Sequence, residues 1–523
     1  MNAMIRSDIL EQPGKWRIIG ITTGFLIVAT PALVLMFVTT GAVPGRIGSL
    51  IGGAFGWAIL RSLAVASLAA VFSLAVGLPA GIVAALYDFS ARRLLLGLLA
   101  LPLLLPSFIQ AIGLSLLRPV LGLSADGFLS GLSGVALSFA LFGIPLVLFI
   151  TLASVRGISR SQVDAARLAG GEWHVVGCVA RSVFSAAALA GALAGVLTLS
   201  DPGPGQILGY NGAAAEILVS FASQYDFALA TRQCLLLAGV VFVLSLPVAL
   251  RLAPRLATGL LARDVTPVPL TRNRAASHAG PALLLGLLVF ILVLPLAGFV
   301  RPLFGNFPVG RVAQEVARTL GDTLAYGTMA GLLAVVLGVA LAACAGRSAK
   351  MRIGVLCGLV LVLAAPPSLG ALGWIHLAGV SPASLDPVLR SMFTVSLALA
   401  LRFFPIVTLF AMRGLGTVSP SWAGAAAVHG VSFPKFVQKV LAPWLAPAVL
   451  MAALLVVLLA TADVSSVLLL HPPGRGSLPL AIFTVMANAP ESLVGALCLA
   501  YVGGAAGLLG LGWWLVNTFK TKS

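Results

Sequence analysis

The chain has 523 residues, of which 60% are hydrophobic and only 9% charged, and its mean hydropathy is +1.09. That much apolar surface needs lipid around it, so the composition excludes a soluble domain and predicts a polytopic membrane protein. The formal net charge of +17 is more typical of the cytoplasmic arginines that orient a membrane protein than of nucleic-acid binding.

Twelve apolar runs are long enough to cross a hydrocarbon core of about 30 Å. They predict an all-α protein with about 12 transmembrane helices. In chain order the predicted spans are 18–38, 57–86, 94–117, 134–155, 183–200, 234–253, 282–300, 323–345, 355–377, 391–412, 446–465 and 493–517.

An even number of spans places both termini on one side of the membrane. About two thirds of the 32 Lys and Arg fall on that side, which the positive-inside rule makes the cytoplasm. The first span is too long for a signal-peptide core and lacks a clear cleavage site, so we expect it to remain as a helix.

The second half of the chain repeats features of the first at an offset of 260 or 261 residues. We therefore predict two six-span halves of the same orientation, 1–253 and 282–523, joined by a cytoplasmic linker at 254–281. The positions in register are Gly77 with Gly338, Pro106-Ser107 with Pro367-Ser368, and Pro145 with Pro405.

Two polar loops interrupt the apolar runs at matching places. One, from Gly424 to Pro447, reads GAAAVHGVSFPKFVQKVLAPWLAP, and the other, from Asp164 to Val183, reads DAARLAGGEWHVVGCVARSV. In each loop, small residues that can pack closely are followed by a glycine that lets the backbone turn. In the 424–447 loop, a helix entered through proline comes next.

Both loops resemble the EAA loop of the membrane subunit of a bacterial ABC importer, in which Glu-Ala-Ala, three residues and Gly precede a helix ending in Leu-Pro. We call them the first EAA-like loop (156–182) and the second EAA-like loop (413–445). Asp164 stands where that family has Glu, Gly424 replaces the acid, and Ala442-Pro443 replaces Leu-Pro. The resemblance implies a type I ABC importer permease whose loops couple to an ATPase through Asp164, Ala165, Ala166, Gly170, Ala425, Ala426, Gly430 and Pro443.

The chain itself offers no chemistry for hydrolysing a nucleotide. It lacks a GxxxxGK[ST] phosphate loop and a nucleophile elbow, and its five scattered cysteines form no metal or disulfide pattern. We therefore expect a non-catalytic subunit of the bacterial inner membrane with no cofactor and no metal of its own. The resemblance implies two ATPase subunits that bind ATP and Mg, a periplasmic binding protein and no nucleic-acid partner; an ion-coupled secondary transporter is the alternative from a different class.

Three ionisable residues fall near or within the apolar spans. Asp201 and Asp463 follow the fifth span of each half, and Arg402 lies inside a span close to Pro405. A charge at membrane depth is costly unless it is paired or faces water, so all three are candidates for the translocation path or its gate. Helix capping is the structural alternative for the two acids, and helix packing against a carboxylate is the alternative for Arg402.

The segment Leu468 to Leu478 reads LLLHPPGRGSL. It is similar to the LLL-RPPG, Thr-Leu signature of fused permeases of the ferric-iron type, although His471 stands where that subgroup has Arg. The similarity implies ferric iron as the cargo, with thiamine, a phosphonate, a polyamine or an oxyanion left open.

Overall fold

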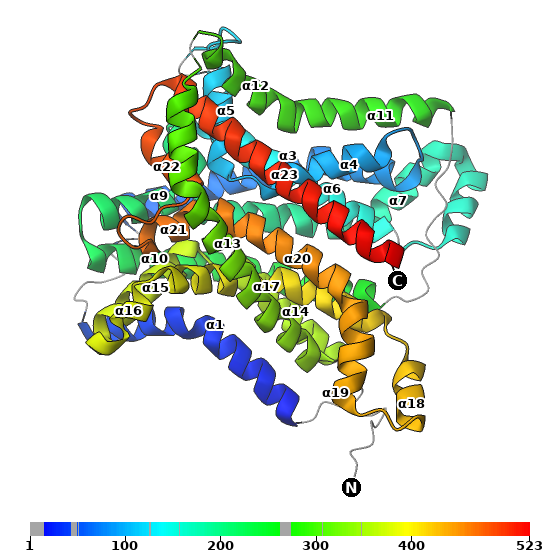
Figure 1. Cartoon of the computed structure of the whole chain (residues 1–523). Coiled ribbons are helices and arrows are strands. Elements are labelled where there is room, and N and C mark those ends of the chain that lie inside the picture. The colour runs from blue at the N-terminus through cyan, green and yellow to red at the C-terminus, as the bar shows by residue number, and fades with distance from the viewer. Residues whose placement is uncertain are drawn as a thin grey trace.

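The computed structural model describes residues 15–42, 50, 52–124, 127–155, 157–261, 274–305, 307–346 and 348–522. The fold is all-helical, as the sequence predicts (Figure 1). Among these residues, ten helices are long and apolar enough to cross a membrane, and the count rises to twelve when each of two bent helix pairs is taken as one span. The chain is thus a multi-pass membrane protein.

The N-terminal segment (15–261) and the C-terminal segment (274–522) repeat one order of long helices, a bent pair and short helices. In the N-terminal segment the helices are α1 Lys15–Ala42, α3 Ala54–Leu86, α4 Arg92–Ala100, α5 Ser107–Leu117, α6 Gly131–Val155, α7 Arg160–Thr198, α8 Gly203–Leu208, α9 Ala213–Leu218 and α10 Phe227–Leu261. In the C-terminal segment they are α11 Arg274–Leu288, α12 Leu294–Val300, α13 Val309–Ala345, α14 Ala349–Ala364, α15 Pro367–Val380, α16 Asp386–Leu389, α17 Met392–Thr417, α18 Pro420–Val428, α19 Phe433–Phe436, α20 Ala442–Ala462, α21 Val464–Leu470, α22 Leu478–Val485 and α23 Glu491–Lys522.

The predicted linker at 254–281 is partly helical. α10 runs on to Leu261 and α11 begins at Arg274, while 262–273 lie outside the described residues. The division of the chain into halves at 253 and 282 remains a prediction.

The third predicted span of each half is bent in the structure. α4 and the 3-10 turn that follows it (Leu101–Leu104) make an angle of 100° with α5, and α14 makes an angle of 83° with α15. Each bend falls where a non-helical residue, Leu105 or Ala365, precedes a proline. A proline ring disfavours the helical conformation of the residue before it, so 94–117 and 355–377 are each two helices.

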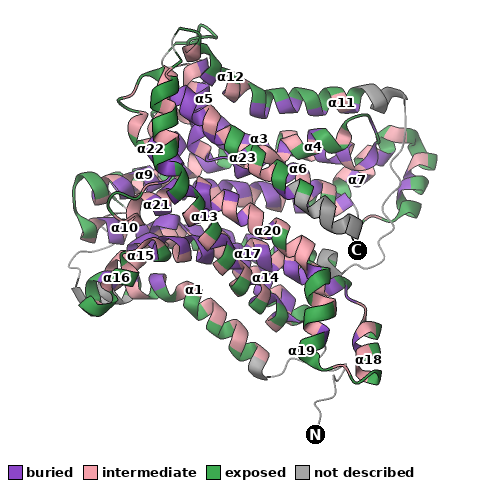
Figure 2. Ribbon diagram, in the orientation of Figure 1, coloured by how far each residue is buried: buried purple, intermediate pink, exposed green. Residues whose placement is uncertain are grey.

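The two most buried spans are α6 and α17. In their apolar windows 72% and 61% of the residues are buried, against 11% for Arg17–Met36 of α1 (Figure 2). A Cβ at Gly77 of α3 would lie 2.8 Å from Val147 of α6, and one at Gly338 of α13 would lie 2.7 Å from Val407 of α17. Both glycines therefore let a long helix pack directly against a central one.

The first span of each segment packs on the other segment. α1 contacts α13 and α15, while α11 and α12, which belong to the first span of the C-terminal segment, contact α4 and α5 (Figure 1). α10 also packs extensively on α14. The two segments therefore form one intertwined bundle.

One arginine in each segment joins the end of a long helix to the start of the bent pair. The Nε of Arg92 donates to the carbonyl of Ala84 at 2.8 Å, and that of Arg352 donates to the carbonyl of Gly346 at 2.7 Å. Cations at a helix C-terminus offset the partial negative charge of its unpaired carbonyls. The 260-residue offset between these arginines is a trace of the repeat that the sequence analysis missed.

Candidate functional site

The two EAA-like loops lie toward one end of the molecule, and the short helices that follow the fifth spans lie toward the other. α7 and α18 are on the right of Figure 1, whereas α9, α21 and α22 are on the left. The candidate coupling residues and the candidate path residues therefore belong to two separate regions.

The first EAA-like loop contains a helix break at two consecutive glycines. Gly171 has φ +70°, whereas Gly170 has φ −166°, an extended conformation that any residue can adopt. The sequence analysis placed the bend at Gly170, but the residue that needs glycine for its backbone is Gly171. At Gly170 space is the constraint, since a Cβ there would lie 2.8 Å from Nδ1 of His174.

Charged side chains hold the two sides of this break together. Asp164 lies 3.5 Å from Arg160 and 3.6 Å from Arg167, and Arg167 donates to Glu172 at 2.7 Å. Glu172 also accepts from the hydroxyl of Tyr87 at 3.0 Å. Burial, followed by the hydrogen bond to Glu172, raises the pKa of Tyr87 to about 12, so its hydroxyl remains a donor at neutral pH.

The second EAA-like loop turns by a different device. α18 ends at Val428, and Gly430, two residues further on, has φ +66°. The N–H of Gly430 donates to Ala427 at 3.1 Å, and that of Val431 donates to Ala426 at 2.9 Å, which is the bonding pattern of a Schellman turn. Gly430 thus provides the left-handed residue that the sequence analysis assigned to it.

Aromatic packing braces this second loop. The rings of Trp422 and Trp444 meet edge to face at 5.2 Å, and Nε1 of Trp444 donates to Thr417 at 3.3 Å. Pro443 lies in the first turn of α20, as expected of a proline that begins a helix. A π-turn at Val437–Leu441 directly precedes α20 within the longer helical span Phe433–Ala462, because a proline in a helix removes a donor and displaces the carbonyl one turn earlier.

Each EAA-like loop exposes a pair of large apolar side chains that the sequence analysis overlooked. Leu168 and Trp173 are 90% and 88% exposed, and Val428 and Phe433 are 85% and 49% exposed. The members of the two pairs stand 260 residues apart, the offset that relates Pro145 to Pro405. We call them the first and second apolar pairs. The alanines behave differently: Ala166 is buried, Ala426 is partly buried, and Ala165 and Ala425 are exposed.

The three candidate path residues come together between the two segments. Arg402 of α17 lies 3.2 Å from Asp463, whose side chain is only 4% exposed. Asp201, which follows α7, lies within electrostatic range of both Arg402 and Asp463. We refer to Asp201, Arg402 and Asp463 as the charge cluster.

Both carboxylates of the charge cluster are held at the starts of short helices. Asp463 accepts from the N–H of Ser466 at 2.9 Å and caps α21. Asp201 accepts from the N–H of Gly203 at 2.9 Å and from the hydroxyl of Ser107 at the bend of the third span. The two acids therefore bond to helix starts, as the structural alternative expects, and also belong to the charge cluster.

The short helices after the fifth spans are anchored alike in both segments. The hydroxyl of Ser62 on α3 accepts from the N–H of Ala213 at 2.9 Å, and that of Thr323 on α13 accepts from the N–H of Leu478 at 2.8 Å. In the HPPG segment, Nδ1 of His471 lies 3.0 Å from the carbonyl of Val467. His471 therefore closes the end of α21, which gives it a structural contact within its own turn.

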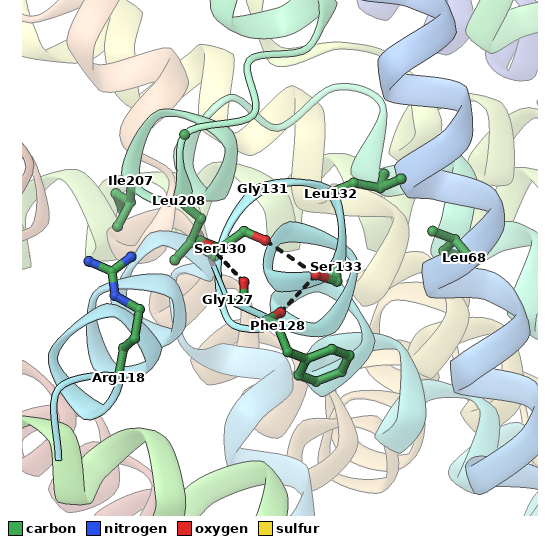
Figure 3. Close-up of a pocket in the computed structure, with 11 residues that line it drawn as sticks. Leu68, Arg118, Gly127, Phe128, Ser130, Gly131, Leu132, Ser133, Ile207 and Leu208 are labelled. Carbon is green, nitrogen blue, oxygen red and sulfur yellow. Dashed lines mark hydrogen bonds between the residues drawn. The ribbon is translucent and has the colours of Figure 1, made fainter. Parts of the chain in front are cut away.

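A cavity of about 800 Å³ lies between α3, the start of α6 and the end of α8 (Figure 3). Its wall includes Leu68, Phe128 and the guanidinium of Arg118. The hydroxyls of Ser130 and Ser133 donate to carbonyls of the same loop, at 2.7 and 2.8 Å. The hydroxyl donors of these two serines are therefore already used within the loop.

Among the described residues, no group of three or more His, Cys, Asp and Glu is placed to hold a metal ion. No known family model matches the chain, and no solved structure matches it.

The charge cluster at a segment interface and the paired polar loops give this membrane protein two separate candidate regions. The chain is similar to the thiamine transport system permease protein ThiP of Brucella abortus, with 26% identity over 370 residues that cover 65% of this chain and 64% of that protein. ThiP of Brucella suis matches at 26% and that of Brucella melitensis at 25% over the same shares. The match thus spans less than two thirds of the length of these relatives.

Proposed function

We propose that this protein is the membrane-spanning permease subunit of an ATP-binding-cassette importer. The observation that carries the proposal is the presence of the two apolar pairs at equivalent positions of the EAA-like loops. Leu168 and Trp173 lie beside the charged residues Asp164, Arg167 and Glu172. Such charged neighbours indicate that the first apolar pair faces water and not lipid. Large apolar side chains exposed among polar ones mark protein interaction sites.

Two loops built alike suit two copies of one partner. We propose that each receives one ATPase subunit, which supplies the sites for ATP and Mg. The loops and both termini would face the cytoplasm of a bacterial cell, and a periplasmic binding protein would deliver cargo to the other face. The resemblance in the loops and the named relatives support this arrangement.

The candidate coupling residues would then act through the shape of the loops. The turns at Gly171 and Gly430 fix the direction of the apolar pairs, and Asp164 stiffens the first loop. Closure of the ATPase subunits on ATP would move both loops, and the intertwined bundle would carry that movement to the charge cluster. A ligand can bias a two-state membrane protein only through contacts that differ between the states.

For the cargo, the relatives favour thiamine over ferric iron. Their printed names state thiamine transport, whereas the HPPG segment that suggested iron contributes a histidine bonded within its own turn. We therefore propose thiamine first and keep ferric iron as the second candidate.

The test is uptake of labelled thiamine by proteoliposomes that contain this chain with its ATPase subunit and binding protein. We expect uptake that requires ATP, and its loss when Leu168→Ser and Val428→Ser are combined. Phe242→Ser, at an exposed position within α10, is the matched control for an apolar loss elsewhere. Uptake without the ATPase subunit, or driven by an ion gradient alone, would refute the proposal and favour a secondary transporter.

A further inference from the structure

The charge cluster joins two carboxylates from the two segments to a single guanidinium. Asp201 belongs to the N-terminal segment, and Arg402 and Asp463 belong to the C-terminal segment. Burial raises the pKa of Asp201 and the nearby charge of Asp463 adds to this effect, whereas its hydrogen bonds to Ser107 and Gly203 and the charge of Arg402 favour the ionised form. With both carboxylates ionised, the cluster carries one net negative charge at the interface of the segments.

The carboxylates of the cluster are held by hydrogen bonds, whereas the contact of the arginine with Asp463 lacks an aligned one. Asp463 is held by both the N–H and the hydroxyl of Ser466, and Asp201 by Ser107 and Gly203. The Nη1 of Arg402 lies 3.2 Å from Asp463, yet it is not aligned for a hydrogen bond. By contrast, Arg475 makes an aligned bond of 3.0 Å to Asp322.

Arg402 is also the more accessible partner of its ion pair. Its side chain is 24% exposed, against 4% for Asp463, and its guanidinium lies 5.4 Å from the ring of Phe403. Asp201 is partly exposed as well. Because the contact between Arg402 and Asp463 lacks an aligned hydrogen bond, another cation can displace the arginine without rebuilding the hydrogen bonds that hold the two carboxylates.

We infer that the charge cluster selects a cationic cargo, with Asp201 and Asp463 as the recognition groups and Arg402 as a tethered cation that the cargo replaces. The inference rests on the proposed function, because it requires the cluster to lie on the transport path. Carboxylates already oriented by their hydrogen bonds need little reorganisation to stabilise an incoming positive charge. The thiazolium of thiamine and a protonated amine both meet this requirement.

The charge of the site can be measured without knowing the cargo. In full-length protein with its ATPase subunit, and with the five native cysteines replaced, Ser200→Cys places a thiol next to Asp201. Ser200 is buried and its hydroxyl has no hydrogen-bond partner among the described residues, so this near-isosteric change costs little. The reaction rates of a trimethylammonium and a sulfonate methanethiosulfonate are compared, each normalised to Ser223→Cys in an exposed turn.

We expect the cationic reagent to react roughly tenfold faster than the anionic one in the ATP-bound importer, because one surplus negative charge in a partly buried site is weakly screened. Asp201→Asn should bring the ratio close to one, and Arg402→Gln should raise it. Asp226→Asn, which removes an exposed carboxylate that caps α10, should leave it unchanged.

Equal rates for the two reagents, faster reaction of the anionic one, an unchanged ratio in Asp201→Asn, or a thiol that never reacts in any nucleotide state would each overturn the inference. The labelling result is separate from the uptake assay. A chain that fails to take up thiamine refutes the proposed cargo, while the labelling ratio still reports whether the site prefers cations.

Discussion

The two EAA-like loops display equivalent apolar pairs on differently built supports. In the first loop Asp164 bridges two arginines and Arg167 continues to Glu172 across the helix break. In the second loop a Schellman turn at Gly430 and the Trp422–Trp444 contact do the bracing. Asp164, the acid of the first loop, pairs with arginines of its own loop. At Gly424, the matching position of the second loop, no atom lies within 4 Å of an added Cβ. The exposed pair is thus common to the loops, while the means of holding it is not.

The largest effect is expected where the loops are alike, at the apolar pairs. Trp173→Ala should weaken binding of the ATPase subunit by about thirtyfold or more, because truncation of a large aromatic anchor at an interface costs about 2 kcal/mol or more. Phe433→Ala should cost less, since Phe433 is 49% exposed against 88% for Trp173. Binding to the purified permease in nanodiscs measures both, with Trp57→Ala as the control. If Trp173→Ala binds like this control, the first pair is not a docking surface.

The next effect concerns the turns. Gly171 has φ +70° and ψ −165°, a region that essentially only glycine adopts, so Gly171→Ala should cost about 1–3 kcal/mol. Gly430 has φ +66° and is the left-handed residue of the Schellman turn, so Gly430→Ala should cost about 1–2 kcal/mol. No atom lies within 4 Å of the added Cβ at either position, so the backbone alone sets the cost and the loss at Gly171 should be at least as large as that at Gly430. Thermal unfolding and uptake measure both losses. Gly424→Ala, within α18, is the control and should be neutral or stabilising; a larger loss at Gly430 than at Gly171 would mean that one of the turns is not held as described.

The sequence located both turning points, but it could not tell which of two adjacent glycines turns. Gly170 and Gly171 are identical as residues, and only their backbone angles separate them. Composition also does not report the direction of a helix axis. Pro106 and Pro367 therefore indicated the repeat, but not that their spans bend by 100° and 83°. Asp201, Arg402 and Asp463 were each identified by the cost of a buried charge. Their meeting depends on the packing of two segments, which no local pattern encodes.

A smaller effect should follow from the charged bracing of the first loop. Asp164→Asn removes the contacts to Arg160 and Arg167, but Asp164 is 50% exposed, so we expect a loss of about 0.2–1 kcal/mol. Raising the salt concentration from about 0.01 M to about 1 M shortens the screening length from about 30 Å to about 3 Å and should reduce the difference in uptake between Asp164→Asn and the unmodified protein. Gly424→Asp is the reciprocal variant, and it should gain nothing because Ala427 stands where the first loop has Arg167. A gain in the second loop would show that the acid contacts the partner directly.

The smallest effect is expected from the second loop's hydrogen bond. Trp444→Phe keeps an aromatic ring for Trp422 but removes the N–H that donates to Thr417 at 3.3 Å. An exposed hydrogen bond contributes about 0.5 kcal/mol or less after exchange with water. Thr417→Val removes the same bond from the other side, so the double variant should lose no more than either single one. Trp444→Ala should cost about 0.5–1.5 kcal/mol beyond the lost apolar area because it also removes the ring pair. None of these losses should change with salt, since no charge is involved. If Trp444→Ala proved as salt-sensitive as Asp164→Asn, the two loops would not be braced by different forces.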